Sequence, residues 1–233
     1  MRAGLGTGLV VAALAVLLFL RRFVVTQPLP LTRDPLLNSD LSGQLAGLVL
    51  VVVTVLGVRL LGSPSRLLRK GNLRERAEGM RILTITAYAR WSSVIRNLAV
   101  LTAGSAAAVI IWQMGPPTAA MVNRLHFALL LSVPLAAVNA AVEEGLVRLA
   151  LLEGVLDHLG KKKAALLSAA LLAAFHLPGG IPGAVIAALM GLVLARSVVE
   201  TGGVFGAWLV HFFHDVVVFT LLFLLGGRTL PLT

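Results

Sequence analysis

The sequence has no cysteine and little charge. Only 13% of its 233 residues are Asp, Glu, Lys or Arg, against about 25% in a typical soluble domain. The absence of cysteine excludes disulfides, thiolate-bound zinc or iron–sulfur clusters, and cysteine nucleophiles. The scarcity of charge, together with 58% hydrophobic residues, excludes an ordinary soluble protein.

The sequence is instead rich in long apolar runs. A membrane-spanning helix needs about 20 apolar residues, so the chain accommodates about seven to eight spans with short connections. We predict an all-α fold, a polytopic integral membrane helical bundle with a single domain over residues 1–233. The first run is expected to be a retained span rather than a cleaved signal peptide, and a proline-rich loop is expected over residues 27–40. The apolar runs are residues 4–20, 41–61, 98–114, 119–142, 164–177, 184–195 and 204–225.

The basic residues are concentrated between the apolar runs, and the formal net charge is +10. They are densest in residues 63–93, which the positive-inside rule predicts to be a cytoplasmic loop. The apolar spacing within this loop fits an interfacial amphipathic helix, with Tyr88 and Trp91 at the headgroup level, and a solvated basic loop fits equally well. The expected partner is a bilayer with anionic headgroups rather than nucleic acid. The basic residues include Arg66, Arg69, Lys70, Arg74, Arg76, Arg81 and Arg90, opposed by Glu75 and Glu78.

Three clusters of polar residues interrupt the apolar helices of the C-terminal half. In the first, Glu144 and Arg148 are four residues apart and can pair on one helix face. Glu143 lies on the adjoining face, four residues after Asn139. One carboxylate is thus expected to be neutralised and the other to be available.

The second cluster is His176, at the end of an apolar run. The third is His211, His214 and Asp215, of which His211 and Asp215 share a helix face. Buried ion pairs that lock helices together would explain each cluster singly. Because ionisable groups are costly inside a bilayer, the three clusters together predict a functional site.

The residue types favour hydrolysis, since glutamate and histidine activate water and fixed positive charge stabilises an oxyanion. There is no His-Glu-x-x-His for a zinc protease and no Gly-x-Ser-Gly for a serine protease. An aspartyl dyad is excluded because Asp215 is the one aspartate of an apolar helix. A metal site built from Glu143, His176 and His211 stays an alternative.

The three clusters resemble the motifs of the CAAX-protease and bacteriocin-processing (CPBP or Abi) family of membrane endopeptidases. The first motif, Glu-Glu-x-x-x-Arg, is matched in full, and the third, His-x-x-x-Asn or Asp, is matched by His211 and Asp215. The second, Phe-x-x-x-His, is matched at His176 but has Leu172 in place of phenylalanine. The resemblance covers residues 132–225.

The resemblance implies a metal-independent, glutamic-type intramembrane protease that opens towards the cytoplasm and needs no cofactor. Residues 119–225 would form the catalytic core, preceded by N-terminal helices over residues 1–115. Glu143 and His176 would activate water, and His211 and Asp215 would face the oxyanion. Glu144 and Arg148 would orient and charge-balance the site.

Asp215 is the main departure, because an ionised carboxylate accepts hydrogen bonds and cannot donate one to an oxyanion. Either Asp215 is protonated, or it orients His211 and leaves that imidazole as the donor. We favour the second, and we expect the substitution at Leu172 to alter only packing around His176.

The expected activity is hydrolysis of a peptide bond near the terminus of a membrane-anchored or amphipathic substrate. The alternatives are a catalytically silent scaffold or bacteriocin-immunity protein, and a proton-coupled transporter. Arginine outnumbers lysine, and alanine, glycine, valine and leucine dominate, which is typical of a GC-rich bacterial genome. The expected location is therefore the bacterial cytoplasmic membrane.

Overall fold

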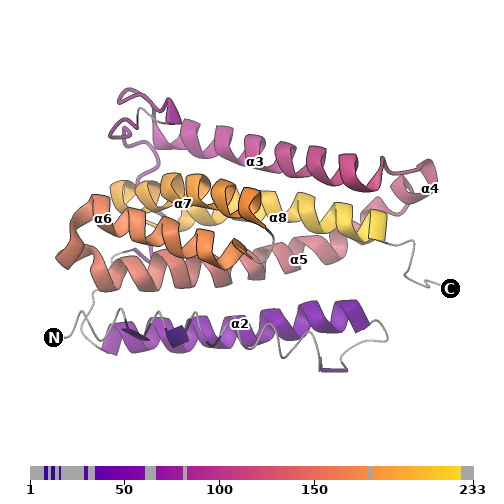
Figure 1. The fold of residues 1–233 in the computed structure, drawn as a ribbon, viewed down its shortest axis with the longest axis horizontal. Helices are drawn as coiled ribbons and strands as arrows, with labels where there is room; N and C mark the ends of the chain where they lie inside the picture. The colour runs from indigo at the N-terminus through magenta and orange to yellow at the C-terminus, as the bar shows by residue number, and fades with distance from the viewer. Residues whose placement is uncertain are drawn as a thin grey trace.

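The computed structural model describes residues 8–9, 12–13, 16, 29–30, 35–60, 67–80, 83–177 and 180–226. Its long helices run side by side along one axis, which confirms the all-α prediction (Figure 1). Most of the predicted first span, residues 4–20, lies outside the described residues. The helices are α2 (Pro35–Leu60), α3 (Trp91–Met114), α4 (Ala119–Val122), α5 (Leu125–Glu144), the π-helix η2 (Gly145–Ala150), α6 (Leu151–His176), α7 (Ile181–Thr201) and α8 (Phe205–Gly226).

Five candidate membrane spans lie within the described residues, so the predicted seven to eight are not reached there. The longest candidate, Leu125–His176, reverses direction at Gly160, whose φ of 70° and ψ of 166° are not helical. After this turn the hydroxyl of Ser168 donates to the carbonyl of Val147 at 2.8 Å. The two limbs of the candidate therefore fold back against each other.

Several predicted boundaries are wrong. Helix α2 begins at Pro35, inside the expected loop, because proline at a first helical position removes an N–H that has no intrahelical partner. The third run begins at Trp91 rather than at residue 98. The fourth is interrupted at Asn123 and Arg124, which separate α4 from α5.

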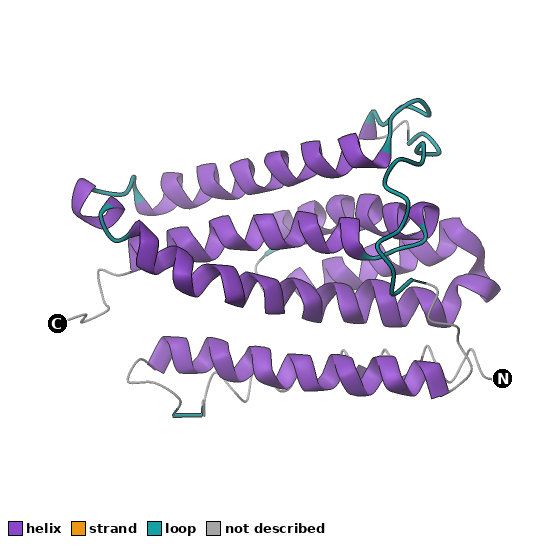
Figure 2. Cartoon of the chain, turned by 180° about the vertical axis from the view of Figure 1, so that it is seen from behind, coloured by secondary structure: helices purple, strands orange, loops and turns teal. Residues whose placement is uncertain are grey.

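The described part of the basic segment, residues 67–80 and 83–90, is a loop with two isolated bridges and not an amphipathic helix (Figure 2). Trp91, the first residue of α3, is fully buried in the protein. The loop crosses the α7–α8 connection, where Asn72 N–H donates to the Thr201 carbonyl at 2.8 Å. A side chain at Gly203 would collide with the backbone of Gly71, so this crossing requires glycine.

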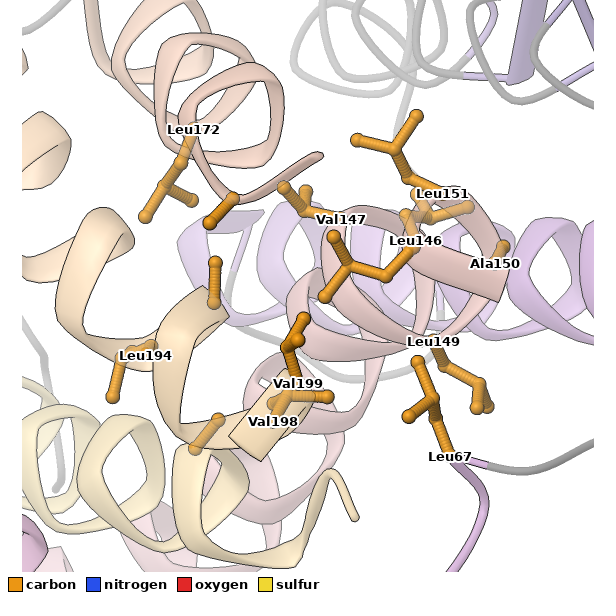
Figure 3. Close-up of a cluster of buried hydrophobic side chains, with 14 of the residues drawn as sticks. Leu67, Leu146, Val147, Leu149, Ala150, Leu151, Leu172, Leu194, Val198 and Val199 are labelled. Atoms are coloured by element: carbon orange, nitrogen blue, oxygen red, sulfur yellow. The ribbon is translucent and has the colours of Figure 1, made fainter. Parts of the chain in front are cut away.

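The apolar core lies between η2, α6 and α7 (Figure 3). Helix α8 packs against both α3 and α5, and α2 lies outermost, against α5 and η2. This arrangement brings the end of α5 and the first half of α8 into the interior, where the polar clusters meet. The fully buried leucines and valines of the core include Leu146, Leu151, Leu152, Leu172, Leu194 and Val198.

Candidate functional site

The first and third polar clusters meet where the last turn of α5 packs against α8. Immediately after Glu143 and Glu144 the chain changes from α-helix to the π-helix η2, which carries Arg148. Single π-helical turns inside α-helices are rare and are frequent at functional sites. No motif in the sequence predicts this turn.

Glu144 is the most buried carboxylate of the site and has two partners. Its Oε2 lies 3.3 Å from Nε of Arg148, and its Oε1 lies 2.8 Å from Nδ1 of His211. The exposed fractions of these three residues are 1%, 0% and 3%. The pair between Glu144 and Arg148 has the geometry that the four-residue spacing predicts.

Glu143 is more accessible than Glu144, with 11% of its side chain exposed. Its Oε2 lies 3.3 Å from Nε2 of His211, and its Oε1 lies 3.3 Å from Nδ2 of Asn139. Both ring nitrogens of His211 therefore face glutamates. One carboxylate is paired with the arginine, and the other is the more exposed of the two.

Asp215 does not make the contact that we expected. Its Oδ2 accepts a hydrogen bond from Nδ2 of Asn139 at 2.9 Å, while Nδ1 of His211 faces Glu144. The structure thus gives the orienting contact on His211 to Glu144. The reason is the rotation of the ring, which directs its two nitrogens to the two glutamates of α5.

His176 is the last residue of α6 and is partly buried. Its Nδ1 lies 2.9 Å from the carbonyl of the fully buried Leu172. A neutral imidazole that donates from Nδ1 keeps its lone pair on Nε2.

Arg148 is fully buried, yet its Nη1 and Nη2 have no hydrogen-bond partner among the described residues. Helix α7 approaches at Gly191, where an added Cβ would lie 3.5 Å from Nη2 of Arg148 and 3.2 Å from the Leu172 side chain. The glycine leaves room for the guanidinium between α6 and α7. The site is therefore a buried charged cluster whose donors are only partly satisfied.

Two further residues of the site, Asn139 and His214, are not among the predicted catalytic residues. Asn139 precedes Glu143 by four residues, and His214 follows His211 by three, so helical spacing was the available signal. The ring centroids of His211 and His214 are 6.5 Å apart. Within the described residues no three His, Asp or Glu side chains are arranged to hold a metal.

Comparison with known proteins identifies a matching protein family. Residues 125–217, which include all three clusters, match the family model described as type II CAAX prenyl endopeptidase Rce1-like. Neither the curated proteins nor the solved structures contain a significant match to the chain. The family match confirms the resemblance of the three motifs.

Proposed function

Because residues 125–217 form an Rce1-like CAAX prenyl endopeptidase domain, we propose that the protein is an intramembrane peptidase that uses Glu143 to activate water. The observation that carries the proposal is the buried network of Glu143, Glu144, Arg148 and His211 on membrane-spanning helices. A purely structural network would not need a second carboxylate at its accessible edge.

In the proposed reaction, water attacks the carbonyl carbon of the scissile peptide bond and Glu143 takes up its proton. His176, with its lone pair on Nε2, assists in holding the water. His211, oriented by Glu144, stabilises the oxyanion of the tetrahedral intermediate through an N–H. Glu143 then returns the proton to the leaving amine as the carbon–nitrogen bond breaks.

In this scheme Arg148 and Glu144 form an ion pair whose charge does not change during the reaction. The guanidinium of Arg148 lies on the far side of Glu144 from His211, so the cation neutralises Glu144 without competing for the imidazole. Glu143 is then the carboxylate that gains and loses the proton.

The proposed substrate is a membrane-anchored or amphipathic peptide cleaved near its terminus, since the site lies on helices long and apolar enough to cross a bilayer. The proposed location is a bacterial cytoplasmic membrane with anionic headgroups. Basic side chains of the loop at one end of the bundle would contact those headgroups. The exposed ones are Arg69, Lys70, Arg74, Arg76 and Arg90.

The test is cleavage of membrane-tethered candidate peptides by purified protein in detergent with excess chelator. The compared proteins are wild type, Glu143→Gln and the control Glu75→Gln, which makes the same change on the exposed loop. We expect cleavage by wild type and by the control, and at least a hundredfold loss in Glu143→Gln with unchanged thermal unfolding.

Two other outcomes would point to a different function. Cleavage that disappears with chelator would restore the metal-site alternative. If none of the folded proteins cleaves any peptide but all bind the peptides equally, the scaffold or immunity alternative replaces the peptidase.

A further inference from the structure

The amide of Asn139 lies between two carboxylates that come from different helices. Its Nδ2 is 2.9 Å from Oδ2 of Asp215 on α8 and 3.3 Å from Oε1 of Glu143 on its own helix, α5. An amide NH₂ has two hydrogens, so one nitrogen can serve both acceptors. Both contacts lie at the level where Nε2 of His211 faces Glu143.

We propose that Asn139 is a positioning residue of the peptidase, which fixes Glu143 for water activation by bridging it to Asp215. The inference rests on the proposed function. The physical reason is that two neighbouring carboxylates repel each other when both are ionised, and the amide hydrogens of Asn139 contact both. Asn139 contacts Oε1 of Glu143, while Nε2 of His211 faces its Oε2.

The chemistry of the neighbours determines the orientation of this amide. An ionised carboxylate accepts hydrogen bonds and donates none, so only the NH₂ end of Asn139 can face Asp215 and Glu143. The same reasoning assigns Asp215 a role as the anchor of the bridge on α8. Neither protonation of Asp215 nor a direct contact with His211 is needed to explain its place in the site.

The bridge can be tested by exchanging its two ends. Asn139→Asp leaves three carboxylates together with no amide, and we expect kcat to fall at least tenfold with KM changed by less than about twofold. Asp215→Asn keeps an acceptor for Asn139 in its amide carbonyl, so we expect only a few-fold loss of kcat. The double variant Asn139→Asp/Asp215→Asn restores a hydrogen bond between α5 and α8 with its donor on α8, but it leaves a carboxylate facing Glu143. We therefore expect it to regain unfolding temperature relative to Asn139→Asp but not kcat.

The matched control is Asn97→Asp, which makes the same change at an exposed position of α3. All proteins are compared in detergent for peptide cleavage and for thermal unfolding. A double variant that regains the unfolding temperature lost in Asn139→Asp, while its kcat stays low, supports the bridge. A double variant with the full wild-type kcat overturns it, as does an Asn139→Asp variant with wild-type kcat.

Failure of the proposed function gives a different pattern. If wild type and all variants cleave no peptide, the peptidase assignment fails, and the bridge is then judged by the unfolding temperatures of the same proteins. A temperature restored in the exchanged variant supports the bridge, and strictly additive shifts of the two single substitutions overturn it.

Discussion

The molecule contains two networks of charged residues that differ in how completely they are satisfied. The intramembrane cluster joins α5, η2 and α8, and the end cluster joins the basic loop to α3, α6 and α7. The members of the intramembrane cluster are Glu143, Glu144, Arg148, His211 and Asp215. The members of the end cluster are Glu78, Trp91, Lys161, Arg196 and Glu200.

In the end cluster, Glu200 accepts from Arg196, from the indole N–H of Trp91 at 3.1 Å and from the backbone N–H of Glu78 at 2.8 Å. Arg196 also donates to Glu78. In the intramembrane cluster, by contrast, all three guanidinium nitrogens of the fully buried Arg148 lack a hydrogen-bond partner among the described residues, and Nε makes only an ion-pair contact with Glu144. The end cluster, whose donors have acceptors, attaches the loop to the bundle. The intramembrane cluster keeps buried donors without acceptors, which can take part in a reaction.

The largest loss of stability is expected from removing the arginine of the intramembrane cluster. Arg148→Met leaves Glu144 buried without its cation and should lower the free energy of unfolding by about 3–5 kcal/mol. Adding Glu144→Gln removes the uncompensated charge and should recover part of that loss. Thermal unfolding in detergent measures both, and equal unfolding temperatures for wild type and Arg148→Met would contradict the interpretation.

At the end cluster, Glu200→Gln should cost about 1–3 kcal/mol of stability, because an amide satisfies fewer of the four donors that converge on Glu200. Activity per folded molecule should stay near the wild-type value, since the cluster lies outside the proposed site. Cleavage rates normalised to folded protein, with Glu75→Gln as the control, check this expectation. A loss of kcat larger than the loss of folded protein would show that the two clusters are coupled.

Gly191→Ala tests the space beside Arg148. The new methyl group would lie 3.2 Å from the Leu172 side chain and from the Ala169 backbone, so α6 and α7 must separate slightly. The better helix propensity of alanine offsets part of the cost, and we expect a net loss of about 1 kcal/mol. The cleavage rate should fall by more than the loss of folded protein explains, because α6 carries His176. Gly104→Ala, with nothing near its Cβ, is the control and should keep full activity.

The smallest effect is expected for Lys161→Ala. The Lys161–Glu78 pair is 3.6 Å long and more than half exposed on both sides. Its loss should change stability by less than about 0.5 kcal/mol. A larger shift in unfolding temperature would mean that the turn at Gly160 depends on this pair.

Helical spacing was enough to predict the pair between Glu144 and Arg148, because four residues make about one turn of one helix. It was not enough to assign the partner of Asp215, since contacts between α5 and α8 depend on how the two helices rotate against each other. The amphipathic ring of Trp91 likewise did not reveal its burial or its partner, because the acceptor of its N–H, Glu200, lies on α7. The long-range partners that decide these positions are more than 70 residues away in sequence.

The π-helix after Glu144 accommodates one residue more than an ordinary α-helical turn would. A π-turn closes an i→i+5 hydrogen bond, whereas an α-turn closes an i→i+4 bond. Deleting one residue between Glu144 and Arg148 would let this segment close as an ordinary α-helix, with little change in the orientation of the helix beyond it. Arg148 would then be the third rather than the fourth residue after Glu144, so the deletion would change the geometry of the buried ion pair although no side chain of the site had been replaced.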